Sequence, residues 1–151
     1  MLLLDLQRQP INKQSMRIGK TRSGRTISFS NEKKRNEKID VILQLQNQLP
    51  LGFQTIHGPV RVEYEFCYEF IKSLPKSRRY KHLRAGKPDI DNIQKAINDC
   101  LDADHAGKVS VTPILSDDSQ IVEISAKKYN DFKNRILIKI TQIGGQNAKL
   151  F

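Results

Sequence analysis

The sequence predicts an α+β fold, a single domain in which a mixed or mostly antiparallel sheet packs against two main helices. At 151 residues the chain is long enough for one hydrophobic core and short for two. Strand patterns stand before and after the helical patterns, without the regular alternation of a parallel-sheet protein. We expect the folded domain over residues 1–143, and residues 144–151, which begin with Gly144-Gly145, to form a flexible C-terminal tail.

A short strand and a hairpin are expected near the N-terminus. Leucines alternate over residues 2–6, and Pro10 ends the strand pattern. Apolar residues at 16–18 and 27–29 flank Ser23-Gly24, a pair that is typical of tight turns. The sequence therefore predicts a hairpin on either side of this turn.

The first helix is expected after Ser30 or Asn31, either of which can cap it, with Glu32 in the first turn where the helix dipole favours an acid. Apolar residues then recur at roughly helical spacing until Pro50 stops the pattern; they are Ile39, Ile42, Leu45 and Leu49. The clearest strand follows over residues 60–70, where apolar and charged residues alternate.

The second helix is expected to begin near residue 90, and its apolar stripe consists of Ile90, Ile93, Ile97 and Cys100 or Leu101. Two further strands, over residues 121–128 and 135–140, follow a loop. A turn region is expected between them at Asn130-Asp131.

Charge is the most informative feature of the composition. There are 26 Lys and Arg against 16 Asp and Glu, a net charge of +10 and a pI near 9.8. This surplus favours a polyanionic partner, most commonly nucleic acid, although a ribosomal-type or merely basic soluble protein would share it. Cys67 and Cys100 lack the neighbours of a zinc site or a disulfide framework. Asp5 interrupts the first leucines, so we expect no signal peptide, no membrane partner and a cytoplasmic location.

A run of basic residues covers the chain from Lys72 to Lys87, where there is no acid and where Tyr80 and His82 are interleaved. A solvated loop is one interpretation of this run. Because it leads directly into Asp89, delivery of a nucleic-acid phosphate is the better one, and the candidate DNA-binding residues are Lys76, Arg78, Arg79, Lys81, Arg84 and Lys87. Basic residues of the predicted hairpin could reach a second backbone; they are Arg17, Lys20, Arg22 and Arg25.

Acidic residues surround the start of the second helix. Asp89 and Asp91 project the same way if the chain there is extended, and Asp91 and Lys95 share a face if the helix has begun. For Asp91 alone, a capping box with Gln94 is the simpler interpretation, and a Lys four residues later is usually a surface ion pair.

A second acidic pair, Asp117-Asp118, stands just before the strand at residue 121. Alone it indicates a solvated turn. If this pair gathers with Asp89 and Asp91, the four carboxylates would repel one another unless a cation neutralised them. Mg²⁺ is a usual choice for oxygen ligands. An acidic pocket in a basic protein is the layout expected of a nuclease. Asp102-Ala103-Asp104-His105 also resembles a metal cluster, but with Gly107 following it a loop with a helix C-terminal cap is favoured.

Two motifs resemble those of the RusA family of Holliday junction resolvases. Lys87-Pro88-Asp89-Ile90-Asp91-Asn92 with Lys95 is similar to the D-x-D-N-x-x-K signature, and Asp117-Asp118-Ser119-Gln120-Ile121 with Lys128 to the D-D-x-Q-[IV] signature. The segment from Pro10-Ile11-Asn12 to the basic hairpin also resembles the family's N-terminal region. The resemblance extends over roughly residues 2 to 141, so residues 1–143 would be a RusA-like endonuclease domain. The loop from Leu101 to Ser116 is longer than we expect for the family.

This resemblance implies a homodimer that binds four-way DNA junctions and cuts two strands symmetrically with Mg²⁺, for which Mn²⁺ could substitute. By position, Asp89, Asp91 and Asp118 would be catalytic and bind the metal, with Asp117 less clearly involved, and Lys95 would be catalytic by stabilising charge on the phosphate. The role would be Holliday junction resolution in DNA recombination and repair.

The reaction expected is metal-assisted hydrolysis of a phosphodiester, with an activated water attacking in line. Two alternatives belong to other classes. A protein that binds junctions without cutting them would keep the basic surface and lose the acids, which are present here. A small-molecule phosphohydrolase with a metal site would not need a charge of +10, and salt-sensitive DNA binding would separate it from a nuclease.

Overall fold

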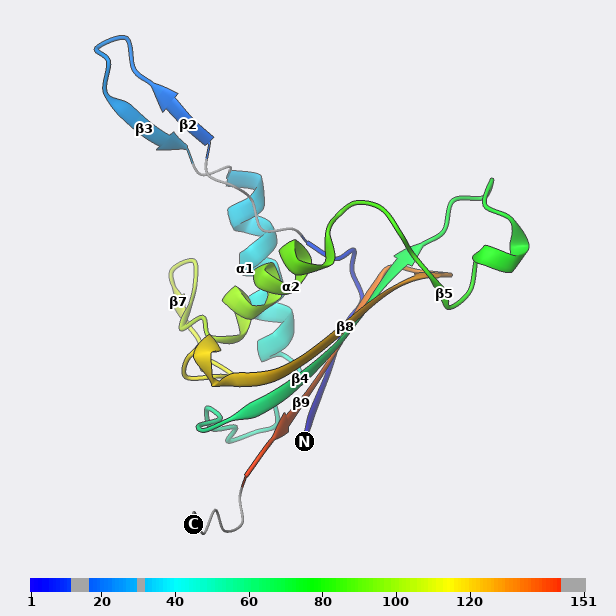
Figure 1. The fold of residues 1–151 in the computed structure, drawn as a ribbon. Helices are drawn as coiled ribbons and strands as arrows, with labels where there is room; N and C mark the ends of the chain where they lie inside the picture. The colour runs from blue at the N-terminus through cyan, green and yellow to red at the C-terminus, as the bar shows by residue number, and fades with distance from the viewer. Residues whose placement is uncertain (12–16, 30–31, 145–151) are drawn as a thin grey trace, which may run out of the picture.

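The computed structural model describes residues 1–11, 17–29 and 32–144, and in this part of the chain it contains one domain with two helices on one face of a five-stranded sheet (Figure 1). The elements in chain order are β1 (Leu2–Leu6), β2 (Arg17–Lys20), β3 (Thr26–Phe29), α1 (Glu32–Gln46), β4 (Val60–Glu69), the 3-10 turn η1 (Lys76–Arg78), β5 (His82–Leu83), α2 (Ile90–Leu101), β6 (His105–Ala106), β7 (Val109–Ser110), the 3-10 turn η2 (Asp118–Gln120), β8 (Ile121–Asp131) and β9 (Arg135–Gln142). The predicted α+β class with a mixed sheet is confirmed.

The strand order in the large sheet is β1-β9-β4-β8-β5, with β4 and β8 parallel and the other pairs antiparallel. A parallel pair needs a crossover connection, and α2 lies in the connection between β4 and β8. A crossover helix runs back against its strands, so α2 begins near the far end of β4 and ends near the start of β8. This geometry places the two acidic motifs at opposite ends of one helix.

The core lies between the helices and one face of the sheet. Alternate residues of β4 are buried there, because successive side chains of a strand point to opposite faces; they are Val60, Val62, Tyr64, Phe66 and Tyr68. The stripe predicted for α2 is confirmed, since Ile93, Ile97 and Leu101 are fully buried. The Tyr64 hydroxyl, itself buried, donates to Asn98 Oδ1 at 2.5 Å and so fixes α2 against the sheet.

Several sequence predictions about element ends were wrong. α1 ends at Gln46, a turn earlier than the apolar pattern reached, although Leu49 still packs against the core. Asn130-Asp131 is the end of β8 and not a turn, because it pairs with the end of β4. The β2–β3 hairpin is confirmed, whereas Met16, the expected caps Ser30 and Asn31, and the predicted tail beyond Gly144 lie outside the described residues.

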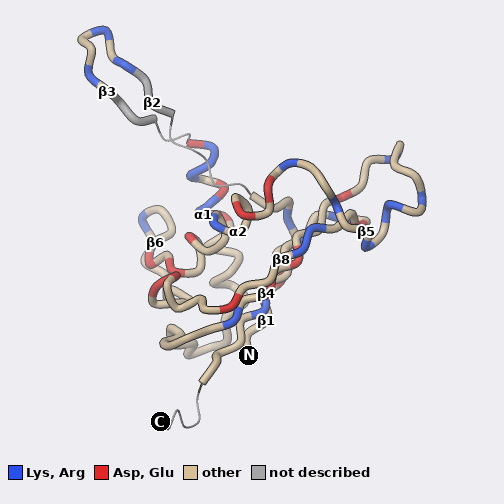
Figure 2. Tube along the Cα trace, in the orientation of Figure 1, with Lys and Arg blue, Asp and Glu red and all other residues tan. Residues whose placement is uncertain are grey.

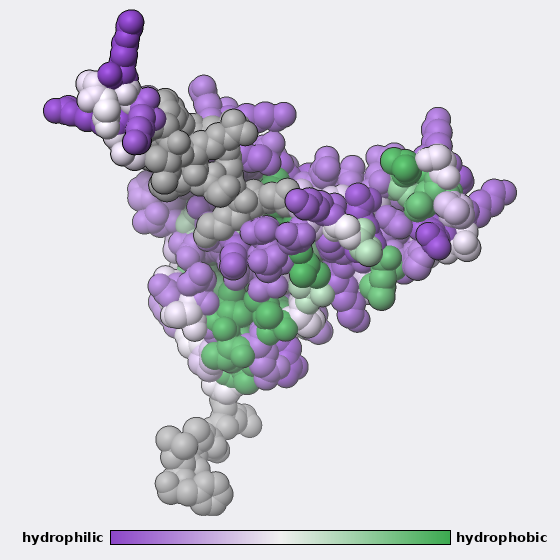
Figure 3. Space-filling view, turned by 45° about the horizontal axis from the view of Figure 1, so that its top comes forward, coloured by the Kyte–Doolittle hydropathy of each residue, from purple (hydrophilic) through white to green (hydrophobic). Residues whose placement is uncertain are grey.

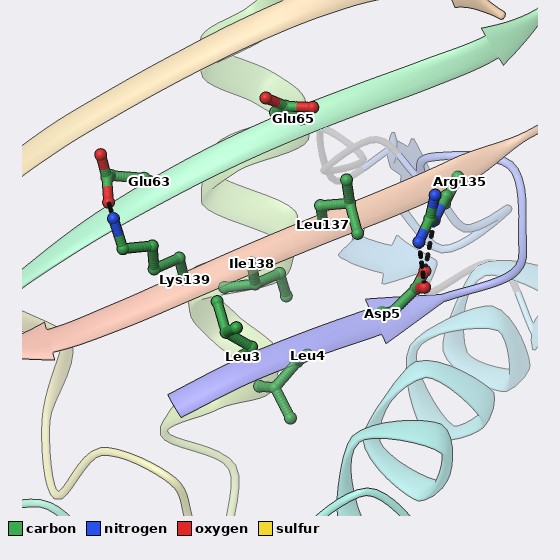
Figure 4. A pocket seen from close by; sticks show the side chains of 9 residues that line it. All are labelled: Leu3, Leu4, Asp5, Glu63, Glu65, Arg135, Leu137, Ile138 and Lys139. Atoms are coloured by element: carbon green, nitrogen blue, oxygen red, sulfur yellow. Dashed lines mark hydrogen bonds and ion pairs between the residues drawn. The ribbon is translucent and has the colours of Figure 1, made fainter. Parts of the chain in front are cut away.

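The sheet face opposite the helices carries a row of ion pairs. Lys139 Nζ lies 2.6 Å from Glu63, Lys81 Nζ lies 3.1 Å from Glu65, and further pairs join Arg61 to Glu123 and Arg135 to Asp5. Two of these pairs and Leu3 line a hollow of about 490 Å³ between β1, β4 and β9 (Figure 4). Its carboxylates are engaged by cations, so the hollow is not where free acidic ligands are found.

Candidate active site

The start of α2 brings Asp91 and Lys95 together. Asp91 lies in the first turn of the helix, and Lys95 Nζ lies 3.7 Å from its Oδ2. Both side chains are about 60% exposed, at 61% and 60%, so this pair is open to solvent and to a ligand. The predicted i,i+4 arrangement is confirmed.

Asp89, and not Asp91, is the N-cap residue of α2. Its backbone is extended, with φ −68° and ψ 140°, but its side chain makes no capping hydrogen bond. The capping box that the sequence suggested for Asp91 and Gln94 is therefore wrong. Carboxylates at a helix N-terminus are stabilised by the helix dipole whether or not they cap it. Within the described residues the Asp89 carboxylate forms no hydrogen bond or ion pair, which leaves it available for a cation.

Lys128 on β8 holds the segment that precedes Asp89. Its Nζ donates to the backbone oxygens of Gly86 and Pro88, each at 2.6 Å. Burial lowers the pKa of Lys128, as does nearby Arg84, while Asp89 acts in the opposite direction. No role was predicted for Lys128 from the sequence, where it only accompanies the second acidic motif. The available signal was a lysine on the helix-facing side of β8, where apolar residues are expected.

Replacing Lys128 by methionine is expected to lower any activity that depends on the start of α2 roughly 10-fold, as loss of an orienting partner typically does. The two carbonyls would lose a charged donor, and the Gly86–Pro88 backbone before Asp89 would be less well fixed. The rate of that activity, measured at several concentrations of an added divalent cation, gives the size of the effect. Lys127→Met is the matched control, because Lys127 is exposed and its substitution removes the same charge. Equal losses in both variants would assign the effect to charge alone.

The second acidic pair divides into one structural residue and one free residue. Asp117 caps η2: its side chain accepts from the Ser119 N–H at 2.8 Å, while the Asp117 N–H donates to Gln120 Oε1 at 3.0 Å. The hydrogen bond from Ser119 also lowers the pKa of Asp117. Asp118 is exposed, and within the described residues no hydrogen bond or ion pair engages its carboxylate. Of the two, Asp118 is the one available as a ligand.

Asp118 lies toward the C-terminal end of α2. Burial, followed by the charges of Asp118 and Asp99, raises the pKa of Asp102, which is the C-cap of that helix. The Asp102–His105 segment leads into the β6–β7 hairpin, with Gly107 at φ +66°, so Gly107 serves that turn and not the helix end. His105 Nδ1 is bound to Asp104 at 2.5 Å.

The three predicted metal ligands are not gathered into one group. Among residues 1–11, 17–29 and 32–144, no set of three or more His, Cys, Asp or Glu side chains is positioned to hold a metal. The donor chemistry of Asp89 and Asp91 nevertheless fits Mg²⁺, which is often held by one or two carboxylates and completes its shell with water and substrate phosphates. The start of α2 therefore suits an ion that the substrate helps to bind.

Two cationic segments project on either side of this site (Figure 2). One is the basic loop, residues 72–87, and the other is the basic hairpin, residues 17–29. Of the predicted DNA-binding residues, Lys76, Arg78 and Lys87 are exposed and form no ion pair within the described part of the chain.

The other three predicted DNA-binding residues have partners within the chain. The Arg79 side chain donates to Leu74 O and Lys72 O, Lys81 pairs with Glu65, and Arg84 lies 4.6 Å from the Tyr68 ring centroid. The buried Asn130 side chain also donates to Arg78 O at 2.9 Å. These contacts fix the loop, so its cations divide into residues that shape it and residues that face solvent.

Exposed carboxylates and a lysine at a helix N-terminus, between two cationic projections, suit the hydrolysis of nucleic-acid phosphodiesters. The family model for endodeoxyribonuclease RusA matches residues 8–141. The chain is also 28% identical over 139 residues to a crossover junction endodeoxyribonuclease RusA of Lactococcus phage r1t, covering 92% of this chain and 95% of that protein. The chain belongs to the RusA family of Holliday junction resolvases, and it is an endodeoxyribonuclease. No helix within the described residues is long and apolar enough to span a membrane.

Proposed function

We propose that this protein resolves four-way DNA junctions by Mg²⁺-dependent hydrolysis of paired phosphodiesters, in DNA recombination and repair. The observation that carries the proposal is made at the N-terminus of α2. There the Asp89 carboxylate, which makes no capping hydrogen bond, precedes the exposed Asp91–Lys95 pair. The name of the phage relative, a crossover junction endodeoxyribonuclease, supports four-way DNA as the substrate.

In this proposal Asp89 and Asp91 hold the ion. The acid predicted as a third ligand, Asp118, lies toward the other end of α2 and is left out of the ligand set. A bound Mg²⁺ would polarise the scissile phosphate and lower the pKa of an attacking water. Lys95 offsets the charge that develops on the phosphate, because its ammonium group lies beside Asp91 and is exposed. The free cations of the basic loop, Lys76, Arg78 and Lys87, bind the flanking phosphates.

We further propose that the protein acts as a homodimer. A four-way junction presents two equivalent strands, and a two-fold dimer would present two equivalent sites to them. Sedimentation of the full chain at several concentrations tests the proposal, and a monomer that still makes paired cuts would contradict it.

Incubation with a synthetic four-way junction tests the activity. Paired nicks at symmetric positions are expected with Mg²⁺ and also with Mn²⁺, and no cleavage is expected with excess chelator. A linear duplex of the same sequence is the control substrate. Cleavage that persists in chelator, or equal cutting of both DNAs, would contradict the proposal.

Junction binding is expected to weaken steeply with salt. Each phosphate contact releases condensed counterions, so about five contacts give a slope near −4.5 in a plot of log affinity against log salt concentration. Titrations of the junction at several salt concentrations without Mg²⁺ measure the slope. An affinity that does not change with salt concentration would show that the basic loop does not bind DNA phosphates.

A further inference from the structure

Three aromatic side chains meet at the end of the sheet that lies farthest from η2. Phe70 follows β4, Tyr80 belongs to the basic loop, and Phe132 lies in the turn between β8 and β9. The Phe132 ring centroid is 5.4 Å from that of Phe70 and 5.3 Å from that of Tyr80. We name this cluster, Phe70, Tyr80 and Phe132, the aromatic tip.

The aromatic tip is not part of the hydrophobic core. Phe132 is 65% exposed and Tyr80 is 59% exposed, and Ile71 beside them is 68% exposed. Single exposed apolar residues are common on protein surfaces, whereas exposed aromatic rings in mutual contact usually mark an interaction site. Figure 3 shows hydrophobic residues at the end of the projection on the right, among strongly hydrophilic residues.

The surroundings of the aromatic tip are cationic. Lys72, Lys76 and Arg78 are exposed and form no ion pair within the described residues, and Lys133 follows Phe132 directly. No acid occurs between residues 70 and 88. The two acids nearest the tip are Glu69, which is exposed and directly precedes Phe70, and Asp131, which accepts a hydrogen bond from the backbone N–H of Phe132 at 2.7 Å, so cations outnumber acids there. An aromatic surface within such a field is complementary to a nucleic acid and unfavourable for a basic partner.

The aromatic tip is also held in place before any ligand arrives. The Arg79 guanidinium lies 5.2 Å from the Phe70 ring centroid and donates to Lys72 O at 2.6 Å and to Leu74 O at 2.7 Å. The Phe70 N–H donates to Asp131 O at 3.0 Å, which joins the β4 end to the β8–β9 turn. Rings that are already ordered lose little conformational entropy when they bind.

We propose that the aromatic tip is a stacking site for unpaired DNA bases at the branch point of the substrate. Aromatic side chains beside backbone-binding cations are the usual means of holding single-stranded DNA, because every base offers a face to stack on. A linear duplex hides those faces, while a branch point or a gap can expose them. The proposal rests on the proposed function in that the enzyme's own substrate supplies such bases.

Substitutions of Phe132 test this site. In the absence of Mg²⁺, Phe132→Ala and Phe132→Leu are expected to weaken binding to a four-way junction about 10-fold, since stacking of one base is typically worth that much or more. Binding of these variants to a linear duplex of equal length is expected to stay unchanged. Phe132→Tyr keeps an aromatic ring and is expected to bind the junction as tightly as the parent. A 2-aminopurine base at the branch point is expected to change its fluorescence on binding the parent protein and much less on binding Phe132→Leu.

Controls separate stacking from folding and from self-association. Leu51→Ala removes a fully exposed apolar side chain elsewhere, and it is expected to leave junction binding unchanged. Junction binding by Phe132→Leu as tight as that of the parent would overturn the proposal, as would an equal loss of duplex binding. A change in sedimentation of Phe132→Leu would also overturn it, because the tip would then join two copies of the chain.

A duplex with a three-nucleotide gap separates this proposal from the proposed function. It offers unpaired bases without a four-way junction. If the parent does not cleave junctions yet prefers the gapped duplex through Phe132, the proposed function fails and the stacking site stands. If the parent cleaves junctions and Phe132→Leu binds both branched and gapped DNA like the parent, the stacking site fails alone.

Discussion

Replacing Asp91 by asparagine is expected to abolish junction cleavage and to leave junction binding intact. The substitution keeps the size of the side chain but removes a charged oxygen from the head of α2, where the proposed ion binds. Loss of Lewis-acid assistance costs several kcal/mol of transition-state stabilisation, so the single-turnover rate is expected to fall roughly 10³-fold or more. Junction binding measured without Mg²⁺ should be equal or slightly tighter, since one repulsive charge is gone.

The position of Asp91 in the structure also predicts that Asp91→Asn folds. Asp91 lies in the first turn of α2 but does not cap the helix, so Asp91→Asn removes a dipole interaction of about 0.3–1 kcal/mol and no hydrogen-bonded cap. A small change in melting temperature is therefore expected. Asp104→Asn, in the exposed segment beyond α2, makes the same change of charge outside the proposed ligand set and should cut normally. Near-normal cleavage by Asp91→Asn would show that Asp91 binds no ion.

The sequence predicted the parts of the fold that follow from local patterns. The alternation of β4 and the stripe of α2 are properties of single segments, and both lie where their periods indicated. The parallel pairing of β4 with β8 could not be predicted in this way, because it depends on a crossover across more than fifty residues. The two-residue strand β5 belongs to the basic loop and was missed, because it forms only by pairing with β8.

The candidate site shows the same limit. The spacing of Asp91 and Lys95 is local to one helix, and the structure confirms it. Whether a carboxylate is free or engaged depends on neighbours distant in sequence. Gln120 completes the cap at Asp117 and donates to Ile56 O at 3.1 Å and Gly58 O at 2.9 Å, which explains why the D-D-x-Q motif contains two structural residues besides Asp118. The support that Lys128 gives to the Gly86–Pro88 backbone likewise joins segments about forty residues apart.

Replacing Lys95 by alanine is expected to lower cleavage roughly 10²-fold or more while the protein folds and binds junctions normally. A charge directed at the transition state contributes that much when it is removed. If Lys95 served only as the i,i+4 partner of Asp91, its loss would cost about 0.3–0.5 kcal/mol of stability and little activity. The 3.7 Å separation and the exposure of both side chains leave no larger structural role for the pair.

Lys95→Arg distinguishes the charge from its geometry. It keeps the positive charge but replaces a compact ammonium group with a planar fork, which a close phosphate and metal site would accommodate poorly. Both Lys95 variants are expected to cut slowly at saturating Mg²⁺, with the Mg²⁺ dependence nearly unchanged because the acids remain. Lys108→Ala, an exposed lysine in the β6–β7 turn, is the charge-matched control. Parental cleavage rates in Lys95→Ala would assign this lysine to the helix and remove it from the chemistry.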